Sequence, residues 1–472
     1  MAEEKKSRLF ALKPIIDRWP AVSKPEGHVP FRTKILWTVL CLIIYYILTQ
    51  VMIYGISGTV IDLFAGYRFI MAGASGSIMH LGIGPIVTAS IILQLFVGAK
   101  IIKLDLTKDE DKGIYQGTQK ILVIVMILVE AIPQVFGYLH PSDTLIKMVG
   151  GLGADIIIIA QLFMGAMLVF FMDELISKWG IGSGISLFIA AGVSESIFYG
   201  LFNWLPINSK EAMSLTNPPA GVIPGTYYMA TQMSINDIMS YGYEYMFIGR
   251  GQVNSIIALI GTIFIFFIVV YAESSRIELP LAHEKVRGAR GRYPIRLIYA
   301  SNIPVILMAA LLANINMFAF LFYTNPSLRN IPFIGGQGWI GAYDITSSNP
   351  SHPLYGGAWY LSNPNGVASW LLPILEGGYG GHAAWQFALK VIIYLAVMII
   401  GSIFFAKFWI ETTDMGASAV AKQIQNSGMQ IPGFRRDPRI LTKVLERYIP
   451  VVTVIGGAAV GCLLYTSPSP RD

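Results

Sequence analysis

Long apolar runs, separated by shorter polar segments, dominate the pattern of this chain. Each run is close to the roughly 20 residues that an α-helix needs to cross about 30 Å of hydrocarbon. The strand-like alternation of a membrane barrel is absent, and lipid offers no hydrogen-bond partners to an open strand. The pattern therefore predicts an all-α, polytopic membrane protein with nine spans. These are residues 34–55, 78–98, 117–139, 153–172, 183–205, 253–271, 295–323, 385–410 and 448–465.

Composition supports the same class of protein. Hydrophobic residues make up 54% of the chain, charged residues make up 13%, and the mean hydropathy is +0.58. Soluble domains have a different balance. Cys41 and Cys462 both lie in apolar runs, so we expect neither a disulfide framework nor a thiolate metal site. The first thirty residues contain no uninterrupted apolar core, so we expect no cleavable signal peptide.

Most of the 34 Lys and Arg residues lie on alternate connections between the predicted spans. Cytoplasmic loops of membrane proteins carry an excess of these residues. We therefore expect a cytoplasmic N-terminus, with residues 1–33 forming a cytoplasmic segment that includes an interfacial helix over residues 9–22. Residues 206–252 and 324–384 fall on the opposite side and are rich in Gly, Pro, Asn and aromatic residues. They are predicted to form small external caps.

Glycine and proline stand at the beginning of a predicted span. Residues 80–98 open with Gly82, Gly84 and Pro85, and a later span opens with a similar glycine-rich run. The preceding segment, residues 58–77, is too polar to cross the membrane and too apolar to lie in water. It is predicted to be a short amphipathic helix that folds back into the membrane and is buried by protein. The alternative is that the glycines only let neighbouring helices pack closely.

Two aliphatic pairs follow those openings at the same offset. They are Ile83 with Val87 and Ile185 with Ile189, and a spacing of four places each pair on one helix face. If both faces line a pore, the apolar lining excludes ions by dewetting. Aliphatic residues at this spacing are also typical of ordinary helix packing, so the spacing leaves both interpretations open.

Several longer runs resemble a known family. They are LGIGPIVTA, DELISKWGIGSGISLFIAAGVS, VVYAESSRIELPLAH, GRYPIRLIYASNIPVILMAALLANI and FWIETT. Together they are similar to SecY, the channel (alpha) subunit of the protein translocon, in its archaeal and eukaryotic-like branch. The resemblance implies a SecY-type bundle of two pseudo-symmetric halves, with five helices expected in each, around an hourglass pore. The halves would be residues 34–205 and 253–465, joined by the external loop 206–252.

The resemblance also implies a function. The chain would be the central pore-forming subunit of the protein-conducting channel in the cytoplasmic (plasma) membrane. It would translocate secretory proteins and insert membrane proteins, with a plug and a lateral gate. Expected partners are SecE-type (gamma) and beta-type single-span subunits, the ribosome through rRNA and ribosomal proteins, signal peptides, nascent polypeptides and membrane lipid. We expect no enzymatic activity, no cofactor and no metal.

Matching the family motifs residue by residue gives candidate sites. The pore ring is expected at Ile83, Val87, Ile185, Ile189 and Ile306, with Ile303 one turn away as an alternative to the last. The polar cluster of the lateral gate is expected at Thr88, Glu130 and Asn314. The plug is expected at about residues 60–72, including Ile61, Asp62, Leu63, Phe64 and Arg68. A carboxyl in mid-span is by default functional or paired, which suits Glu130, and its alternative role is as a protonated packing residue.

The resemblance also implies that two Arg-rich loops dock on the ribosome. Fixed and permanently charged donors suit phosphate contacts, and the candidates are Arg290, Arg292, Arg435 and Arg436. Positive loops also orient helices whatever else they do, so topology alone is the alternative.

Two other classes of membrane protein fit less well. A secondary transporter needs polar coordination near the midplane, and an ion channel needs carbonyl or carboxylate rings. Apart from Glu130, the predicted spans offer little of either. After residue 461 the chain departs from the family pattern. We expect residues 466–472 to be a tail foreign to the fold, and the family's tenth helix to be missing here.

Overall fold

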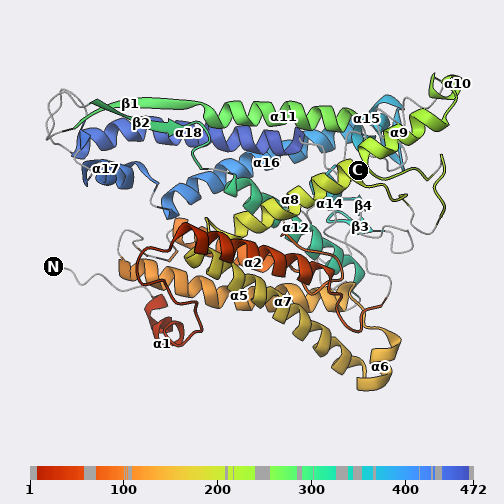
Figure 1. Ribbon diagram of the computed structural model, residues 1–472, viewed down its shortest axis with the longest axis horizontal. Helices are drawn as coiled ribbons and strands as arrows, with labels where there is room; N and C mark the ends of the chain where they lie inside the picture. Colours follow the sequence, from red (N-terminus) through yellow and green to blue (C-terminus); the bar gives the residue numbers. More distant parts are fainter. Residues whose placement is uncertain are drawn as a thin grey trace.

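Apolar helices of membrane-crossing length build the protein (Figure 1). In this computed structural model the described residues are all except 1–7, 58–70, 100, 103, 105–108, 208–210, 216, 240–255, 284–289, 301, 326–337, 344–352, 365–367, 414, 427–428, 431–437 and 467–472. Within the described part of the chain, eight helices are long and apolar enough to span a membrane. A ninth apolar helix, α4, has only 15 residues.

The first half of the bundle consists of apolar helices and their connections. The helices are α2 (Phe31–Gln50), α4 (Gly84–Gly98), α5 (Asp109–Gly137), α7 (Gly151–Trp179) and α8 (Gly184–Phe202). The short helix α6 (Asp143–Val149) connects α5 to α7, and the Ser142 side chain caps its N-terminus. In Figure 1, α2, α5 and α7 form the lower side of the molecule.

The second half lies above the first in the same view. Its long helices are α11 (Ile256–Ser274), α12 (Ile303–Thr324), α16 (Ala384–Thr412) and α18 (Pro438–Thr466). Helices α8 and α12 lie between the two sides (Figure 1). The amphipathic helix α17 (Ala417–Asn426) packs against α18. The predicted helical bundle of two halves is therefore confirmed, and each predicted span overlaps one of these helices.

Within the described residues, three small antiparallel sheets interrupt the all-helical pattern. The largest has the strand order β2-β1-β7, in which β1 (Arg276–His283) pairs with β2 (Arg290–Arg296) and with β7 (Met429–Gln430). The other two are formed by β3 (Ala342–Tyr343) with β4 (Pro353–Tyr355), and by β5 (Gly378–Tyr379) with β6 (His382–Ala383).

The start that we predicted for the seventh span, residue 295, is wrong. Residues 290–296 are strand, and α12 begins at Ile303. Apolar residues at every second position, as in Ile277 and Leu279, are typical of a strand with one covered face. Leu279 indeed packs on a second apolar core, which also buries Ile295.

The N-terminal helix is shorter than predicted. A 3₁₀ turn, η1 (Arg8–Leu12), leads into α1 (Lys13–Ile16), which ends well before residue 22. Pro20 lacks a backbone N–H group and disfavours helix at Trp19, so the helix does not continue through residues 19 and 20. Helix α1 packs on α5, where the Ile16 side chain occupies the space beside Gly117.

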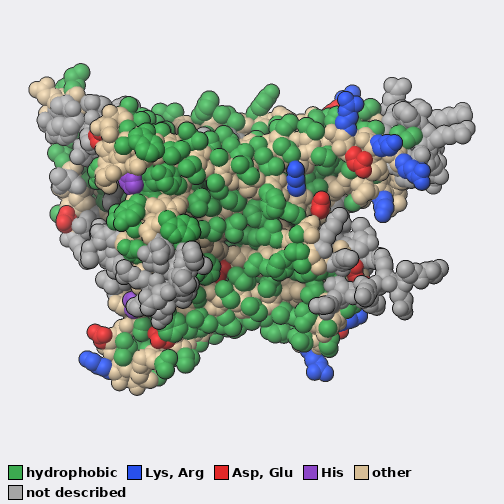
Figure 2. Space-filling view, turned by 180° about the vertical axis from the view of Figure 1, so that it is seen from behind, with side chains coloured by type: hydrophobic (Ala, Val, Ile, Leu, Met, Phe, Trp, Pro, Cys, Tyr) green, Lys and Arg blue, Asp and Glu red, His purple; other side chains and the backbone are tan. Residues whose placement is uncertain are grey.

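The two ends of the bundle differ. We call the end formed by β1, β2, β7 and α17 the hairpin end, and the opposite end, with α6, α9 (Val222–Gln232) and α10 (Ile235–Asp237), the cap end (Figure 1). Helices α14 (Gly357–Leu361) and α15 (Ala368–Leu375) belong to the second connection predicted as an external cap. From behind, hydrophobic side chains cover the middle of the molecule, and most charged side chains gather towards its ends (Figure 2).

The deepest part of the core surrounds α4. Ten of its 15 residues are buried, and it contacts α5, α12 and α16. One large apolar cluster therefore joins the two halves of the bundle around this helix. In contrast, α11 has no buried residue in its described length. An apolar helix of this length with no buried residue requires lipid or another protein as part of its surroundings.

Candidate functional site

A buried turn leads into α4. The backbone of Ile83 donates to Met71 O at 2.8 Å, and that of Ile78 donates to Val51 O at 2.9 Å. Gly82 has a φ of +53° and lies so close to Met71 O that a Cβ atom would overlap it. Glycine is thus required here for both its backbone conformation and its close approach. The segment that follows residues 58–70 is thereby joined to the end of α2 and to the start of α4.

His80 and Tyr45 hold this turn in place. His80 is 2% exposed, its Nδ1 accepts the Gly76 N–H at 3.0 Å, and its Nε2 lies 3.4 Å from Tyr138 Oη. Tyr45 Oη donates to Ala72 O at 2.9 Å. These buried polar groups have hydrogen-bond partners, so the turn has a defined structure deep in the bundle.

The predicted pore-ring residues meet in one apolar cluster. Ile83 and Val87 are buried members, and the side chains packed against the cluster include those of Ile185, Ile189 and Ile306. Ile303, the alternative to Ile306, packs against the same cluster. All of these side chains therefore border the same extended apolar core, and the choice between the last two stays open.

The predicted gate residues are brought together in part. Thr88 Oγ1 donates to Glu130 Oε1 at 2.7 Å in a buried contact between α4 and α5. Gly84 leaves room for the other carboxylate oxygen, because a Cβ atom at this position would lie 3.1 Å from Glu130 Oε2. Asn314 instead donates to Ala310 O, one turn earlier on α12, at 3.0 Å. Sequence reasoning missed Gln134, whose Nε2 lies 3.7 Å from Met317 Sδ of α12.

Several predicted residues fall in segments that the structure does not describe. The plug residues Ile61, Asp62, Leu63, Phe64 and Arg68 lie outside the described residues, as do Arg435 and Arg436. Arg290 and Arg292 lie on β2 of the hairpin, where the backbone of Arg290 pairs with that of Ala282. Arg292 is exposed, and its Nη1 lies 2.6 Å from Glu278 Oε2 on β1.

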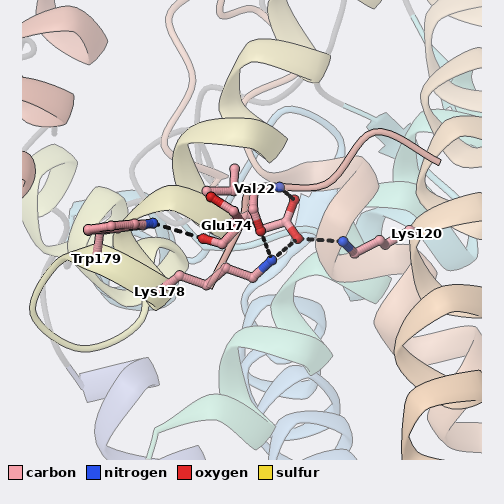
Figure 3. Close-up of polar contacts among 6 residues, drawn as sticks. Val22, Lys120, Glu174, Lys178 and Trp179 are labelled. Atoms are coloured by element: carbon pink, nitrogen blue, oxygen red, sulfur yellow. Dashed lines mark hydrogen bonds and ion pairs between the residues drawn. The ribbon is translucent and has the colours of Figure 1, made fainter. Parts of the chain in front are cut away.

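Sequence reasoning also missed a charged cluster at the hairpin end (Figure 3). Glu174 of α7 is 8% exposed and accepts hydrogen bonds from Lys120 of α5, from Lys178 at 2.7 Å and from the Val22 N–H at 3.3 Å. Lys178 also donates to Val22 O, and Trp179 Nε1 donates to Ser23 O at 2.9 Å. The Glu174 to Lys178 spacing of four was the available signal. The N-terminal segment is thereby fixed to α5 and α7.

The described residues offer no group of three or more His, Cys, Asp and Glu side chains that could hold a metal ion. The chemistry of this part of the chain is that of an apolar core with a few paired polar groups. Such a core can seal, open or bind an apolar segment, since its largest surfaces are hydrocarbon.

These features define a polytopic helical membrane protein whose two halves share one apolar core. The SecY family profile matches residues 77–468, and a second profile, described as the plug domain of Sec61p, matches residues 43–76. The chain therefore belongs to the SecY family. The match to the plug profile ends directly before the turn that leads into α4.

Individual relatives agree with the profiles. The protein translocase subunit SecY of Archaeoglobus fulgidus is 44% identical over 464 residues, which cover 97% of this chain and 89% of that protein. A solved protein-conducting channel has a TM-score of 0.74 at 34% identity and covers 97% of this chain and 92% of its own. Sec61 in the canine ribosome–channel complex has a TM-score of 0.72 at 32% identity, with coverage of 97% and 92%.

Proposed function

We propose that this chain is the pore-forming subunit of a protein translocase, moving secretory proteins across a membrane and membrane proteins into it. The observation that carries the proposal is the position of the plug-profile match. It ends at residue 76, and the buried turn that follows delivers Ile83 and Val87 into the apolar cluster shared by both halves. The proposal includes no catalytic step, because translation by a bound ribosome would supply the driving energy.

The proposed seal is a ring of Ile83, Val87, Ile185, Ile189 and Ile306. Their common apolar cluster supports this role, because a narrow aliphatic constriction excludes water and with it ions. The plug, about residues 60–72, would lie under the ring in the closed channel. The lateral gate would open beside α4, where Thr88 and Glu130 are paired and α12 is the neighbouring helix.

The hairpin end is proposed to face the cytoplasm. The basic residues of the N-terminal segment and of the hairpin support this orientation. Ribosome docking is proposed at Arg290, Arg292, Arg435 and Arg436, and the exposed position of Arg292 suits it. SecE-type and beta-type single-span subunits are proposed as partners, and the exposed apolar length of α11 offers a surface for a membrane helix.

The seal can be tested by conductance in planar bilayers, with the chain purified together with its partner subunits. Replacing Ile83 and Ile185 by Ser should hydrate the constriction and produce an ion leak in the resting channel. Ile197→Ser is a matched control, because this isoleucine is 39% exposed further along α8. The control should stay closed. A contrary result would be a double variant that still translocates a secretory precursor and yet has the same resting conductance as the parent. That result would show that these residues do not form the seal.

A further inference from the structure

The first turn of α8 is capped by a side chain of another helix. The first N–H groups of a helix have no partner within it. Ser183 stands at the N-cap position of α8 and makes no side-chain capping hydrogen bond. Instead, the Ile185 N–H donates to Asp173 Oδ1 of α7 at 2.9 Å. A carboxylate at this position also interacts favourably with the helix dipole.

Gly184 makes this contact possible. A Cβ atom on Gly184 would lie 2.6 Å from Asp173 Cα and 2.6 Å from Asp173 Oδ1. Both distances are too short for a real contact, and the first is to a backbone atom, so any side chain here would push α8 away from α7. The absence of a side chain thus sets the distance between the start of α8 and Asp173.

A second contact fixes the linker between α7 and α8. The Ile181 N–H donates to Thr38 Oγ1 of α2 at 3.1 Å, and the Thr38 hydroxyl itself donates to Lys34 O at 2.8 Å. The linker is therefore held by a side chain of α2 at one point and by Asp173 at the other. This leaves little freedom for the helix that follows.

The residue next to Asp173 fixes the end of α7 itself. Glu174 instead accepts hydrogen bonds from Lys120, Lys178 and Val22 (Figure 3). Consecutive carboxylates thus serve different neighbours. Glu174 joins α7 to α5 and to the N-terminal segment, and Asp173 joins this fixed end of α7 to α8.

We propose that Asp173 is a positioning residue of the pore, which holds the first turn of α8 so that Ile185 and Ile189 keep their place in the ring. The inference rests on the proposed function, in which these two side chains belong to the seal. Asp173 acts through the backbone of α8 and touches no translocating chain. Its role requires an acceptor at the Oδ1 position and no side chain at Gly184.

The experiment measures the position of α8 and the seal separately, using the complete complex in planar bilayers and vesicles. An Ile185→Cys reporter, in a background with Cys41 and Cys462 replaced by Ala, is labelled with a soluble maleimide. Asp173→Ala should raise the labelling rate about tenfold, the factor that corresponds to loss of one hydrogen bond to a charged group. Asp173→Asn keeps an acceptor oxygen and should stay close to the reporter parent.

Two further variants provide a control and a second test of the proposal. Asp155→Ala, at the opposite end of α7, is the matched control and should leave labelling unchanged. Gly184→Ala keeps the carboxylate but displaces α8, so it should raise labelling even if Asp173→Ala fails to fold. Unchanged labelling in both Asp173→Ala and Gly184→Ala would overturn the proposal. It would also be overturned if the reporter in Asp173→Asn were labelled as fast as in Asp173→Ala.

The readouts also separate this proposal from the seal. Faster labelling of Asp173→Ala with no change in conductance would support the positioning role and remove Ile185 from the seal. Unchanged labelling of both variants, together with an ion leak in Ile185→Ser, would overturn the positioning role and leave the proposed function intact.

Discussion

The Thr88 hydroxyl oxygen lies 2.7 Å from Glu130 Oε1, and the missing side chain of Gly84 leaves room for the second oxygen of the same carboxylate. Gly84 and Thr88 are one turn apart on α4, so one helix supplies both a donor and a space. The carboxylate on α5 is therefore held in a shaped site between the two helices. The hydrogen bonding of the Glu130 carboxylate and its packing therefore cannot be changed independently.

A double-mutant cycle tests this relationship. Gly84→Ala should destabilise the protein by about 1 kcal/mol, because the methyl group crowds a carboxylate that its hydrogen bond holds in place. In a Glu130→Ala background the same change should stabilise by about 0.5–1 kcal/mol, since alanine then gains only its helix preference over glycine. Thermal unfolding in detergent micelles measures both values.

Gly151→Ala is the control for that cycle. Gly151 is also the first residue of a helix, and a Cβ atom there would meet no other atom within 4 Å. This variant should have the same effect in both backgrounds. Additive effects of Gly84→Ala and Glu130→Ala would mean that the two positions do not interact.

Gly82→Ala should be more harmful than the same change at another left-handed glycine. At Gly82, alanine meets both backbone strain at φ +53° and an overlap with Met71 O. At Gly27, with φ +101°, alanine meets strain alone, because no atom lies within 4 Å. We expect Gly27→Ala to cost about 1–3 kcal/mol of unfolding free energy and Gly82→Ala clearly more. Equal losses in thermal unfolding would show that the turn into α4 adapts to the methyl group.

Charge reversal of Arg292 should weaken ribosome binding without destabilising the fold. Its ion pair with Glu278 is exposed, and such pairs contribute about 0–1 kcal/mol. Phosphate contacts depend strongly on salt, so the loss of affinity should be largest at low ionic strength. Arg18→Glu, another exposed arginine, is the control for net charge. Co-sedimentation with ribosomes across a salt series measures the effect, and equal loss in both variants would indicate a general charge effect.

The stability of the folded protein should decrease at high pH because Tyr299 loses its proton. Burial, with a smaller contribution from Tyr293, raises the pKa of Tyr299 to about 12, and its hydroxyl donates to Met415 O at 2.9 Å. The ordinary value is about 10, so the unfolded chain loses this proton first. The stabilisation is complete below pH about 10 and is lost as the pH rises to about 12.

Tyr299→Phe removes that titration and should flatten the fall in melting temperature over the same range. Tyr293, whose pKa burial also raises, leaves part of the dependence. The exposed Tyr227→Phe change is the matched control. A curve for Tyr299→Phe that follows the parent through this range would contradict the assignment.

Much of the fold followed from hydropathy, because spans must be apolar over their whole length. Hydropathy does not define the ends of the spans where neighbouring segments are apolar too. The predicted second span began at residue 78, yet residues 78–83 form the buried turn and α4 begins at Gly84. The hairpin was missed because its alternating residues follow directly on an apolar run and lead into another.

The site residues also differ in how far the sequence predicted their contacts. Thr88 and Glu130 were paired through the family resemblance, and their hydrogen bond is present. The contact of Glu174 with Val22 was beyond sequence reasoning, because 152 residues separate them and the contact uses a backbone N–H that any residue could supply. Asp173 was hidden for the same reason. Its partner is the backbone N–H group of Ile185, and a backbone group cannot be recognised from the type of residue that carries it.

The shortness of α4 has a consequence for how the protein responds to its lipid. At 15 residues it is about 22 Å long, less than the thickness of a hydrocarbon layer. A lipid-facing helix of this length would thin the surrounding bilayer. Because α4 is enclosed by α5, α12 and α16, protein covers the shortfall, and its length is independent of acyl-chain length. Hydrophobic mismatch should therefore act on helices that bury little or none of their length, such as α2 and, where no partner helix covers it, α11, so bilayer thickness should tilt the periphery while the centre keeps its dimensions.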